Sequence, residues 1–187
     1  SSRAVARLFN QFFDGMITVD PHLHRYKSLD EIFKIRSERL TAIDLMADYI
    51  KHNIKDPFIF GPDFESYQWA KRAADILGCK ADVLKKHRYS SETVRIKIKK
   101  EAEFIGKTAV VIDDVISTGH TVMEVVAGLK HLGMKRIFCI CTHGIFAENA
   151  LSRIEALGAR VISTNTVNNK SSKIDVSGII SKGMEKF

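Results

Sequence analysis

The sequence predicts an α/β fold in which a mostly parallel, twisted sheet is covered by helices on both faces. Short apolar runs of strand length alternate along the 187-residue chain with longer segments whose apolar residues recur at helical spacing. Polar residues follow directly after several of the short runs, and ligands bind at such positions in open α/β sheets. No internal repeat or low-complexity linker interrupts the alternation. This pattern is typical of a parallel sheet with two covered faces.

The first half of the chain contains expected helices over residues 5–12, 45–50 and 66–77, and expected strands over 16–19, 58–60, 81–84 and 94–98. The helix over 66–77 is expected to stop at Gly78. In the strand over 94–98, Val94, Ile96 and Ile98 alternate with charged residues, which predicts one buried face and one solvated face. Together with the strand before it, this segment is expected to form a hairpin or a flap.

The second half continues the alternation. Strands are expected over residues 108–112, 136–142 and 160–163, and helices over 122–132, 149–157 and, after Asp175, 176–180. Gly133 and Gly158 stand where the first two of these helices should end.

Composition narrows the class of protein. The formal net charge of +7 favours anionic partners such as phosphorylated metabolites. The basic region from Lys85 to Lys100 contains a single aromatic residue, Tyr89, and no interleaved series of aromatics, so no nucleic acid is expected. No apolar run is long enough to span a membrane, and no membrane association is expected. Cys79, Cys139 and Cys141 lie in apolar surroundings and are expected to be buried free thiols in a reducing cytoplasm.

The stretch from Val110 to Thr121 carries the clearest chemical signal. An apolar run ends in Asp113 and Asp114, and a loop of hydroxyl residues and glycine leads into a helix. Loop amides, hydroxyls and the helix N-terminus can bind a phosphate, while the two carboxylates can accept hydrogen bonds from ribose hydroxyls or hold a divalent cation. The expected phosphate-binding residues are Ser117, Thr118, Gly119, His120 and Thr121. The alternative is an ordinary strand–turn–helix in which these residues only cap the helix.

This stretch resembles the phosphoribosyl-pyrophosphate motif shared by type I phosphoribosyltransferases and ribose-phosphate pyrophosphokinases. The motif alone does not choose between the two families. The segment from Cys141 to Phe146, with Thr-His-Gly after a strand, is typical of the pyrophosphokinases. For His143 itself, a structural, hydrogen-bonded side chain is the expected role.

The resemblance to the ribose-phosphate pyrophosphokinases implies roles for residues outside the phosphate loop. Asp20 and His22 match a Val-Asp-x-His pattern whose histidine lies at the ATP phosphates, and Lys86 and Arg88 match the working pair of a mobile catalytic loop. Asp63 matches the aspartate of the family's pyrophosphate loop. The implied metal ligands are Asp20, His22 and Asp63, and the implied catalytic residues are Lys86, Arg88 and His22.

The pyrophosphate loop departs from the family pattern. The family usually follows Pro-Asp with a small residue and two glycines, whereas this chain has Phe64, Glu65 and Ser66. The departure puts in doubt whether the backbone cradles pyrophosphate here, while Asp63 remains available as a metal contact.

The resemblance further implies a kinase-type transferase of nucleotide biosynthesis that uses ATP, ribose 5-phosphate and Mg²⁺, and that forms a cytoplasmic homo-oligomer. Residues 40–166 are expected to form the phosphoribosyltransferase-like domain that binds ribose 5-phosphate. Residues 1–39 and 167–187 are expected to be the remnant of a first α/β domain that lacks its N-terminal segment. Two alternatives remain, a type I phosphoribosyltransferase acting on a base and a non-catalytic sugar-phosphate-binding subunit.

Overall fold

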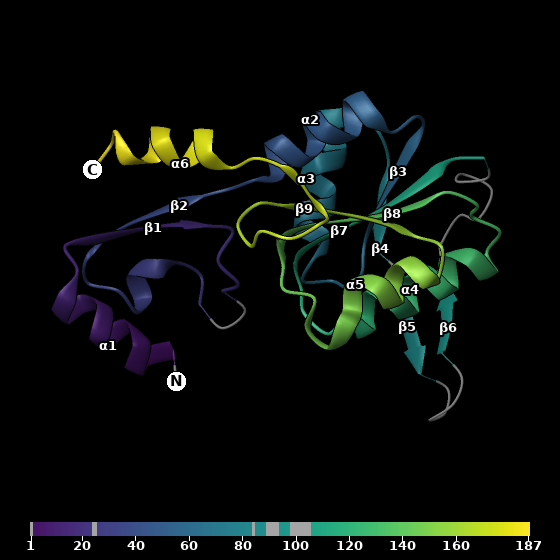
Figure 1. The fold of residues 1–187 in the computed structure, drawn as a ribbon. Helices are drawn as coiled ribbons and strands as arrows, with labels where there is room; N and C mark the ends of the chain where they lie inside the picture. The colour runs from purple at the N-terminus through teal and green to yellow at the C-terminus, as the bar shows by residue number, and fades with distance from the viewer. Residues whose placement is uncertain (1, 24–25, 84, 89–93, 98–105) are drawn as a thin grey trace. The chain divides into compact units, whose positions relative to one another are not determined.

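The structure, a computed structural model, describes residues 2–23, 26–83, 85–88, 94–97 and 106–187, with only the backbone of 85–88 and 94–97 (Figure 1). The chain divides into two compact units. The smaller unit contains residues 1–42 and 176–187, and the larger contains residues 43–175. The sequence places the expected domain boundaries near residues 39 and 166, three and nine residues from these divisions.

The larger unit is built on a six-stranded parallel sheet with the strand order β10-β9-β8-β7-β3-β4. Its strands are β3 (Pro57–Gly61), β4 (Ala81–Val83), β7 (Thr108–Ile116), β8 (Ile137–Gly144), β9 (Arg160–Thr164) and β10 (Ser172–Ile174). Because all of the pairings are parallel, the carboxyl ends of the strands meet at one edge, where polar residues follow the apolar runs. The predicted fold class is confirmed.

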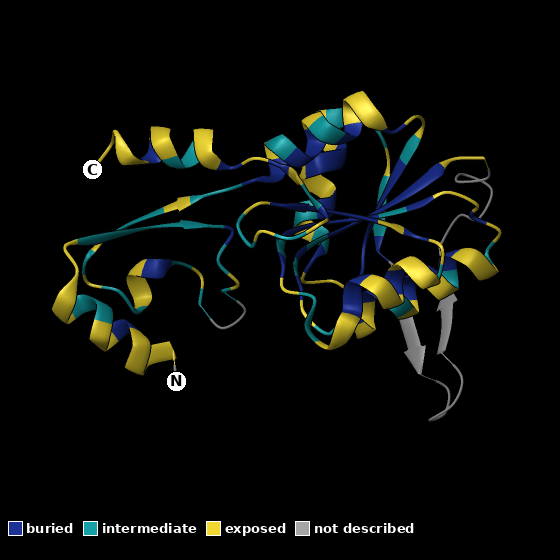
Figure 2. Cartoon of the chain, viewed as in Figure 1, coloured by how far each residue is buried: buried dark blue, intermediate teal, exposed yellow. Residues whose placement is uncertain are grey.

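Helices cover both faces of this sheet (Figure 1). They are α2 (Ile43–Asn53) and α3 (Tyr67–Leu77) on one face, and α4 (His120–His131) and α5 (Ala150–Ala156), preceded by the short 3₁₀ turn η3 (Ala147–Asn149), on the other. Each helix turns its apolar side toward the sheet and its charged side outward, so buried and exposed residues alternate along it at helical spacing (Figure 2).

The two faces of the sheet carry separate sets of buried side chains. Phe58, Phe60, Val111, Cys139 and Cys141 belong to the core cluster that also contains the inner faces of α4 and α5. Residues in between, such as Ile59, Val110 and Ile140, are also fully buried, as the alternation of side chains along a strand requires. Burial on both faces explains the nearly uninterrupted apolar runs of the central strands.

Cys139 and Cys141 are buried as predicted, whereas Cys79, which was also expected to be buried, is only half-buried. All three cysteines are free thiols, and Cys139 and Cys141 are fully buried on the same face of the sheet. Burial raises the pKa of both thiols. They are therefore inert packing residues.

An antiparallel hairpin is present, but its first strand is not the predicted one: the sequence predicts that residues 81–84 pair with 94–98, whereas β4 pairs with β3 in the large sheet. β5 (Lys85–Arg88) pairs with β6 (Val94–Lys97) in antiparallel register, with Lys86 opposite Ile96. The predicted alternation of side chains in this segment lies outside the described residues.

The smaller unit contains two parallel strands, β1 (Gly15–Val19) and β2 (Arg36–Leu40), with α1 (Ser2–Phe12), the 3₁₀ turn η1 (Leu29–Glu31) and α6 (Ser177–Met184). The ring of Phe187 lies against the backbone of Gly15, and the guanidinium of Arg36 lies 4.7 Å from the centre of that ring. Lys186 forms an ion pair with Glu38 at 2.9 Å. These contacts hold residues from the last part of the chain on β1 and β2.

Three strands, β2, β5 and β10, were not predicted from the sequence, and β7 extends beyond its predicted end. β2 reads Arg-Ser-Glu-Arg-Leu, which has too few apolar residues to signal a strand, and β10 has only three residues. β7 continues past residue 112 to Ile116. In the described part of the chain, no helix is long and apolar enough to cross a membrane.

Candidate functional site

Asp113 and Asp114 lie inside strand β7, which corrects the expectation that the strand ends before them. Asp113 is opposite Cys141 in the parallel register with β8, and the strand continues through Val115, opposite His143. The carboxylates therefore stand on a strand paired on one side with β8 and, further back, with β3. A strand places side chains more rigidly than a loop would, which favours binding of a defined ligand.

The loop after β7 turns directly into helix α4. The carbonyl of Ile116 accepts hydrogen bonds from the amides of Ile145 at 3.1 Å and Phe146 at 3.0 Å, which fixes the end of the strand. Gly119 precedes the first residue of α4 with φ of 72°, a conformation that favours glycine. Its carbonyl accepts the first helical hydrogen bond, from Met123 at 2.8 Å.

The residues expected to bind phosphate surround this helix start. Ser117, His120 and Thr121 are exposed, Thr118 is half-buried, and His120 Nδ1 lies 2.8 Å from Thr118 Oγ1. The first turn of a twelve-residue helix presents unpaired amides and a favourable dipole to an anion. The structure thus brings the predicted hydroxyls and a helix N-terminus together next to Asp113 and Asp114.

A serine joins Asp113 to the loop after β3. Ser66 Oγ lies 2.8 Å from Asp113 Oδ1 and 2.8 Å from Asp63 Oδ1, and the Ser66 amide donates to Asp63 Oδ1 at 2.8 Å. Ser66 is buried, with 4% of its surface exposed. From the sequence, Ser66 is predicted to begin a helix and to depart from a glycine-rich loop, but no contact with Asp113 is predicted. Its position three residues after Asp63, at the start of α3, was the available signal.

The Asp113 carboxyl titrates far from its ordinary range. Burial raises its pKa from 3.8 to about 7, the hydrogen bond from Ser66 lowers it, and the nearby charges of Asp114 and Asp63 raise it. Asp114 is 3% exposed, and its Oδ1 accepts the amide of Val115 at 2.9 Å. The Asp113 carboxyl can therefore change its charge near neutral pH.

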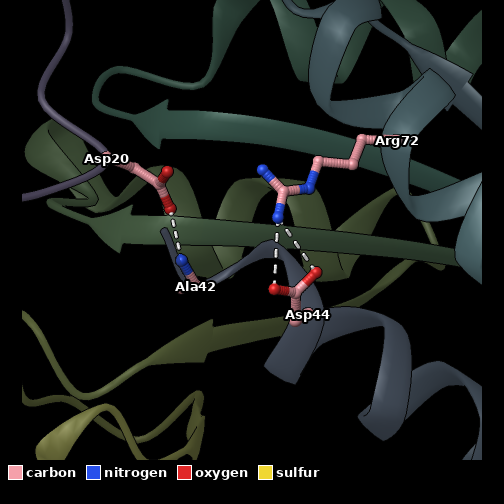
Figure 3. A network of polar contacts seen from close by, with 4 residues as sticks. All are labelled: Asp20, Ala42, Asp44 and Arg72. Carbon is pink, nitrogen blue, oxygen red and sulfur yellow. Dashed lines mark hydrogen bonds and ion pairs between the residues drawn. The ribbon is translucent and has the colours of Figure 1, made fainter. Parts of the chain in front are cut away.

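Asp20 has a structural task in the smaller unit. Its Oδ2 accepts the amide of the fully buried Ala42 at 2.8 Å (Figure 3). Its own amide donates to the carbonyl of Leu40 at 2.9 Å. Asp20 is 1% exposed and has a φ of 39°, whereas His22 is exposed. Figure 3 also shows the ion pair between Asp44 and Arg72, at 3.2 Å on the surface of α2 and α3.

The described residues contain no group of three or more His, Cys, Asp or Glu side chains arranged to hold a metal ion. Asp63 is exposed, and its Oδ1 is occupied by Ser66. Mg²⁺ is commonly held by one or two carboxylates together with substrate phosphates and water, without an all-protein cage. An exposed carboxylate such as Asp63 fits that mode of binding.

His143 takes part in a hydrogen-bond network at the end of β8. Its Nδ1 lies 2.9 Å from Thr166 Oγ1, and that hydroxyl donates to the carbonyl of Thr142 at 2.8 Å. Because Thr166 has one hydroxyl hydrogen, His143 Nδ1 must be the donor in the other bond. The side chain has the hydrogen-bonded, structural environment that the sequence analysis expected.

Lys86 and Arg88 lie in strand β5, and the expected roles of their side chains fall outside the described residues. Only their backbone pairing, with Ile96 and Val94, is described.

A family model for the phosphoribosyl transferase domain matches residues 28–177. The ribose-phosphate pyrophosphokinase of Methanothermobacter thermautotrophicus is 35% identical over 187 residues, which cover 99% of this chain and 64% of that protein. The ribose-phosphate pyrophosphokinase of Pyrococcus abyssi is 32% identical over 186 residues, which cover 100% of this chain and 64% of that protein. The chain therefore spans about 64% of the length of these relatives.

Among solved structures, phosphoribosylpyrophosphate synthetase from Mycobacterium smegmatis has a TM-score of 0.80 at 23% identity, over 98% of this chain and 62% of that chain. Adenine phosphoribosyltransferase from Thermoanaerobacter pseudethanolicus has a TM-score of 0.55 at 23% identity, over 66% of this chain and 76% of that chain. These likenesses concern the fold. The resemblance to ribose-phosphate pyrophosphokinases that the motifs predicted is confirmed by the sequence matches.

Proposed function

The chain belongs to the phosphoribosyl transferase domain family, and from this premise we propose that it transfers the diphosphoryl group of ATP to ribose 5-phosphate. The observation that carries the proposal is the similarity to ribose-phosphate pyrophosphokinases along the whole chain, together with a phosphate-binding loop set beside two carboxylates on β7. In this reaction the 1-hydroxyl of ribose 5-phosphate loses its proton to solvent as its oxygen bonds to the β-phosphorus of ATP. The bond between that phosphorus and the oxygen bridging to the α-phosphate breaks, which releases AMP.

Asp113 and Asp114 accept hydrogen bonds from the ribose hydroxyls in this proposal. The loop from Ser117 to Thr121 and the N-terminus of α4 bind the 5-phosphate. Binding at both ends of the sugar orients its 1-hydroxyl toward the β-phosphorus, and positioning of this kind supplies much of the catalysis in phosphoryl transfer.

The positive and metal-binding groups act on ATP. Lys86 and Arg88 neutralise the charge that develops on the transferred oxygens, and His22 contacts the ATP phosphates. We also propose Asp63, Asp20 and His22 as the residues that would hold Mg²⁺. Bound Mg²⁺ would neutralise and orient the phosphate oxygens. The exposed carboxylate of Asp63 supports its assignment as a metal ligand. Asp20 already accepts a backbone hydrogen bond, so variants of Asp20 test whether it also binds the metal.

The remaining features follow from the same resemblance. We propose that the protein is a cytoplasmic homo-oligomer. The three free thiols support a reducing compartment. We also retain residues 40–166 as the ribose 5-phosphate-binding domain and the segments on either side as part of a second domain. Light scattering on the purified protein would measure the oligomeric state.

The deciding experiment measures AMP released from ATP with and without ribose 5-phosphate, and identifies phosphoribosyl pyrophosphate as the second product. Release that depends on ribose 5-phosphate is expected. A parallel assay supplies phosphoribosyl pyrophosphate and a free base, and nucleotide formation there would identify a phosphoribosyltransferase. Ribose 5-phosphate binding without either product would indicate a non-catalytic subunit.

A further inference from the structure

The hydroxyl of Ser66 stands between two carboxylates that the proposed reaction assigns to different substrates. Asp63 belongs to the pyrophosphate side and Asp113 to the ribose side, and each has its Oδ1 at 2.8 Å from Ser66 Oγ. The two carboxylates therefore lie within the roughly 6 Å at which like charges repel appreciably. The Ser66 hydroxyl contacts both carboxylates and so opposes their separation.

The contacts of Ser66 involve one particular oxygen of each carboxylate. Asp113 Oδ1 accepts the amide of Asp114 at 3.0 Å and lies 2.8 Å from Ser66 Oγ. Asp63 Oδ1 accepts the amide of Ser66 and also lies 2.8 Å from Ser66 Oγ. Because Ser66 has one hydroxyl hydrogen, it donates to one of the two carboxyls, and its oxygen can accept from the other when that carboxyl is protonated. Each of these contacts uses Oδ1 of its aspartate, and the Asp113 carboxyl also contacts the side chain of Asp114.

Burial makes the arrangement rigid. Ser66 is 4% exposed and lies at the start of helix α3, so its backbone is fixed by the helix and its hydroxyl has little freedom to turn to water. A glycine at position 66, as in the usual family pattern, would leave both carboxylates without the serine hydroxyl as a hydrogen-bonding partner. A glycine-rich pyrophosphate loop has no hydroxyl that could link the two carboxylates in this way.

We propose that Ser66 is a positioning residue for the proposed reaction, because its buried hydroxyl contacts Oδ1 of both Asp63 and Asp113 and so fixes how the two carboxylates face the substrates. The proposal rests on the proposed function for the identity of those substrates. Ser66 itself touches neither substrate. It links the ribose-binding strand to the pyrophosphate loop, so that binding of ribose 5-phosphate and productive placement of ATP depend on one hydroxyl.

The test compares Ser66→Ala with Ser171→Ala. Ser171 is a matched control, since it is also 4% exposed and its hydroxyl also contacts two groups, Asn169 Oδ1 at 2.7 Å and Ser163 Oγ at 2.8 Å. Calorimetry measures ribose 5-phosphate affinity, steady-state kinetics measure kcat and KM, and thermal unfolding reports stability. Ser66→Ala is expected to reduce kcat/KM for ribose 5-phosphate about 10- to 100-fold, the usual effect of losing a hydrogen bond to a charged group. Ser171→Ala is expected to change it less than about twofold.

Two further variants separate positioning from a loss of folding. Ser66→Thr keeps the hydroxyl and is expected to retain more activity than Ser66→Ala. In a double-mutant cycle, Ser66→Ala is expected to add little to the defect of Asp113→Ala, because both remove the same bond. Additive effects, or a Ser66→Thr variant that folds but is as defective as Ser66→Ala, would overturn the proposal.

The outcomes also distinguish this inference from the proposed function. A wild-type protein that releases no AMP contradicts the proposed function, yet the affinity for ribose 5-phosphate still tests Ser66. An active wild type whose Ser66→Ala variant equals Ser171→Ala in affinity and kcat/KM contradicts the inference alone.

Discussion

Gly119 lies against Ile154: a Cβ built on Gly119 would come 3.1 Å from Ile154 Cδ1 and 3.2 Å from the Cβ of Ala150. Gly119 opens helix α4, while Ile154 and Ala150 are buried residues of α5. The phosphate loop therefore rests directly on the helix behind it. Its shape depends on a residue without a side chain as well as on the positive φ of 72°.

Gly119→Ala should destabilise the protein and weaken ribose 5-phosphate binding. The left-handed backbone costs an alanine about 1–2 kcal/mol, and crowding against Ile154 adds about 1 kcal/mol or more. Gly133→Ala is the control, since Gly133 has a φ of 83° and open space where its Cβ would stand. Chemical unfolding and calorimetry should find a larger loss for Gly119→Ala in both quantities. Equal losses in the two variants would show that the contact with Ile154 is unimportant.

The free energy of unfolding should depend on Asp113 between about pH 4 and pH 7. Its pKa is about 7 in the folded protein against an ordinary 3.8, so over this interval only the folded state keeps the proton. The contribution of Asp113 is therefore greatest below pH 4 and falls as the pH rises toward 7. The stability of the wild type relative to Asp113→Asn should fall over the same interval, by at most about 4 kcal/mol. Urea unfolding of both proteins from pH 4 to pH 8 would measure it, and a constant difference would contradict the prediction.

The sequence predicted the central sheet well because its strands are buried on both faces. Continuous apolar runs such as the one in β8, bounded by glycine and polar residues, leave few alternatives to a parallel strand. β2 could not be found in this way, because its partly exposed residues carry no apolar alternation. Its strand conformation depends on pairing with β1, which is a tertiary interaction.

The candidate site shows the same division between local and tertiary signals. The loop from Ser117 to Thr121 was recognisable because its residue types and the helix that follows are adjacent in the sequence. Ser66 was not, because the contact that gives it importance joins residues 47 positions apart. The end of β7 was misjudged because carboxylates rarely continue a buried strand, and here Ser66 and backbone amides compensate for their burial.

Variants of Asp20 should separate a structural role from a metal-binding role. Asp20→Ala removes the acceptor of the buried Ala42 amide and is expected to cost about 1–3 kcal/mol of stability. Asp20→Asn keeps an oxygen in that place and should unfold close to the wild-type temperature. If Asp20 also binds Mg²⁺, Asp20→Asn should require a higher Mg²⁺ concentration for AMP release, because an amide is a weaker ligand than a carboxylate. An unchanged Mg²⁺ dependence in a stable Asp20→Asn variant would limit Asp20 to its structural role.

Lys86→Ala should reduce turnover while leaving ribose 5-phosphate affinity nearly unchanged. The resemblance to the pyrophosphokinases places Lys86 at the transferred phosphates, where a positive charge stabilises the transition state more than the bound sugar. Losing one such group is expected to lower kcat about 100-fold or more. Lys85→Ala is the neighbouring control, because Lys85 has the same charge and lies in the same strand but does not match the family's working pair. Single-turnover kinetics and calorimetry on both variants would separate chemistry from binding. Equal kcat values for Lys85→Ala and Lys86→Ala would remove Lys86 from the catalytic residues, since a general loss of positive charge would then explain the effect.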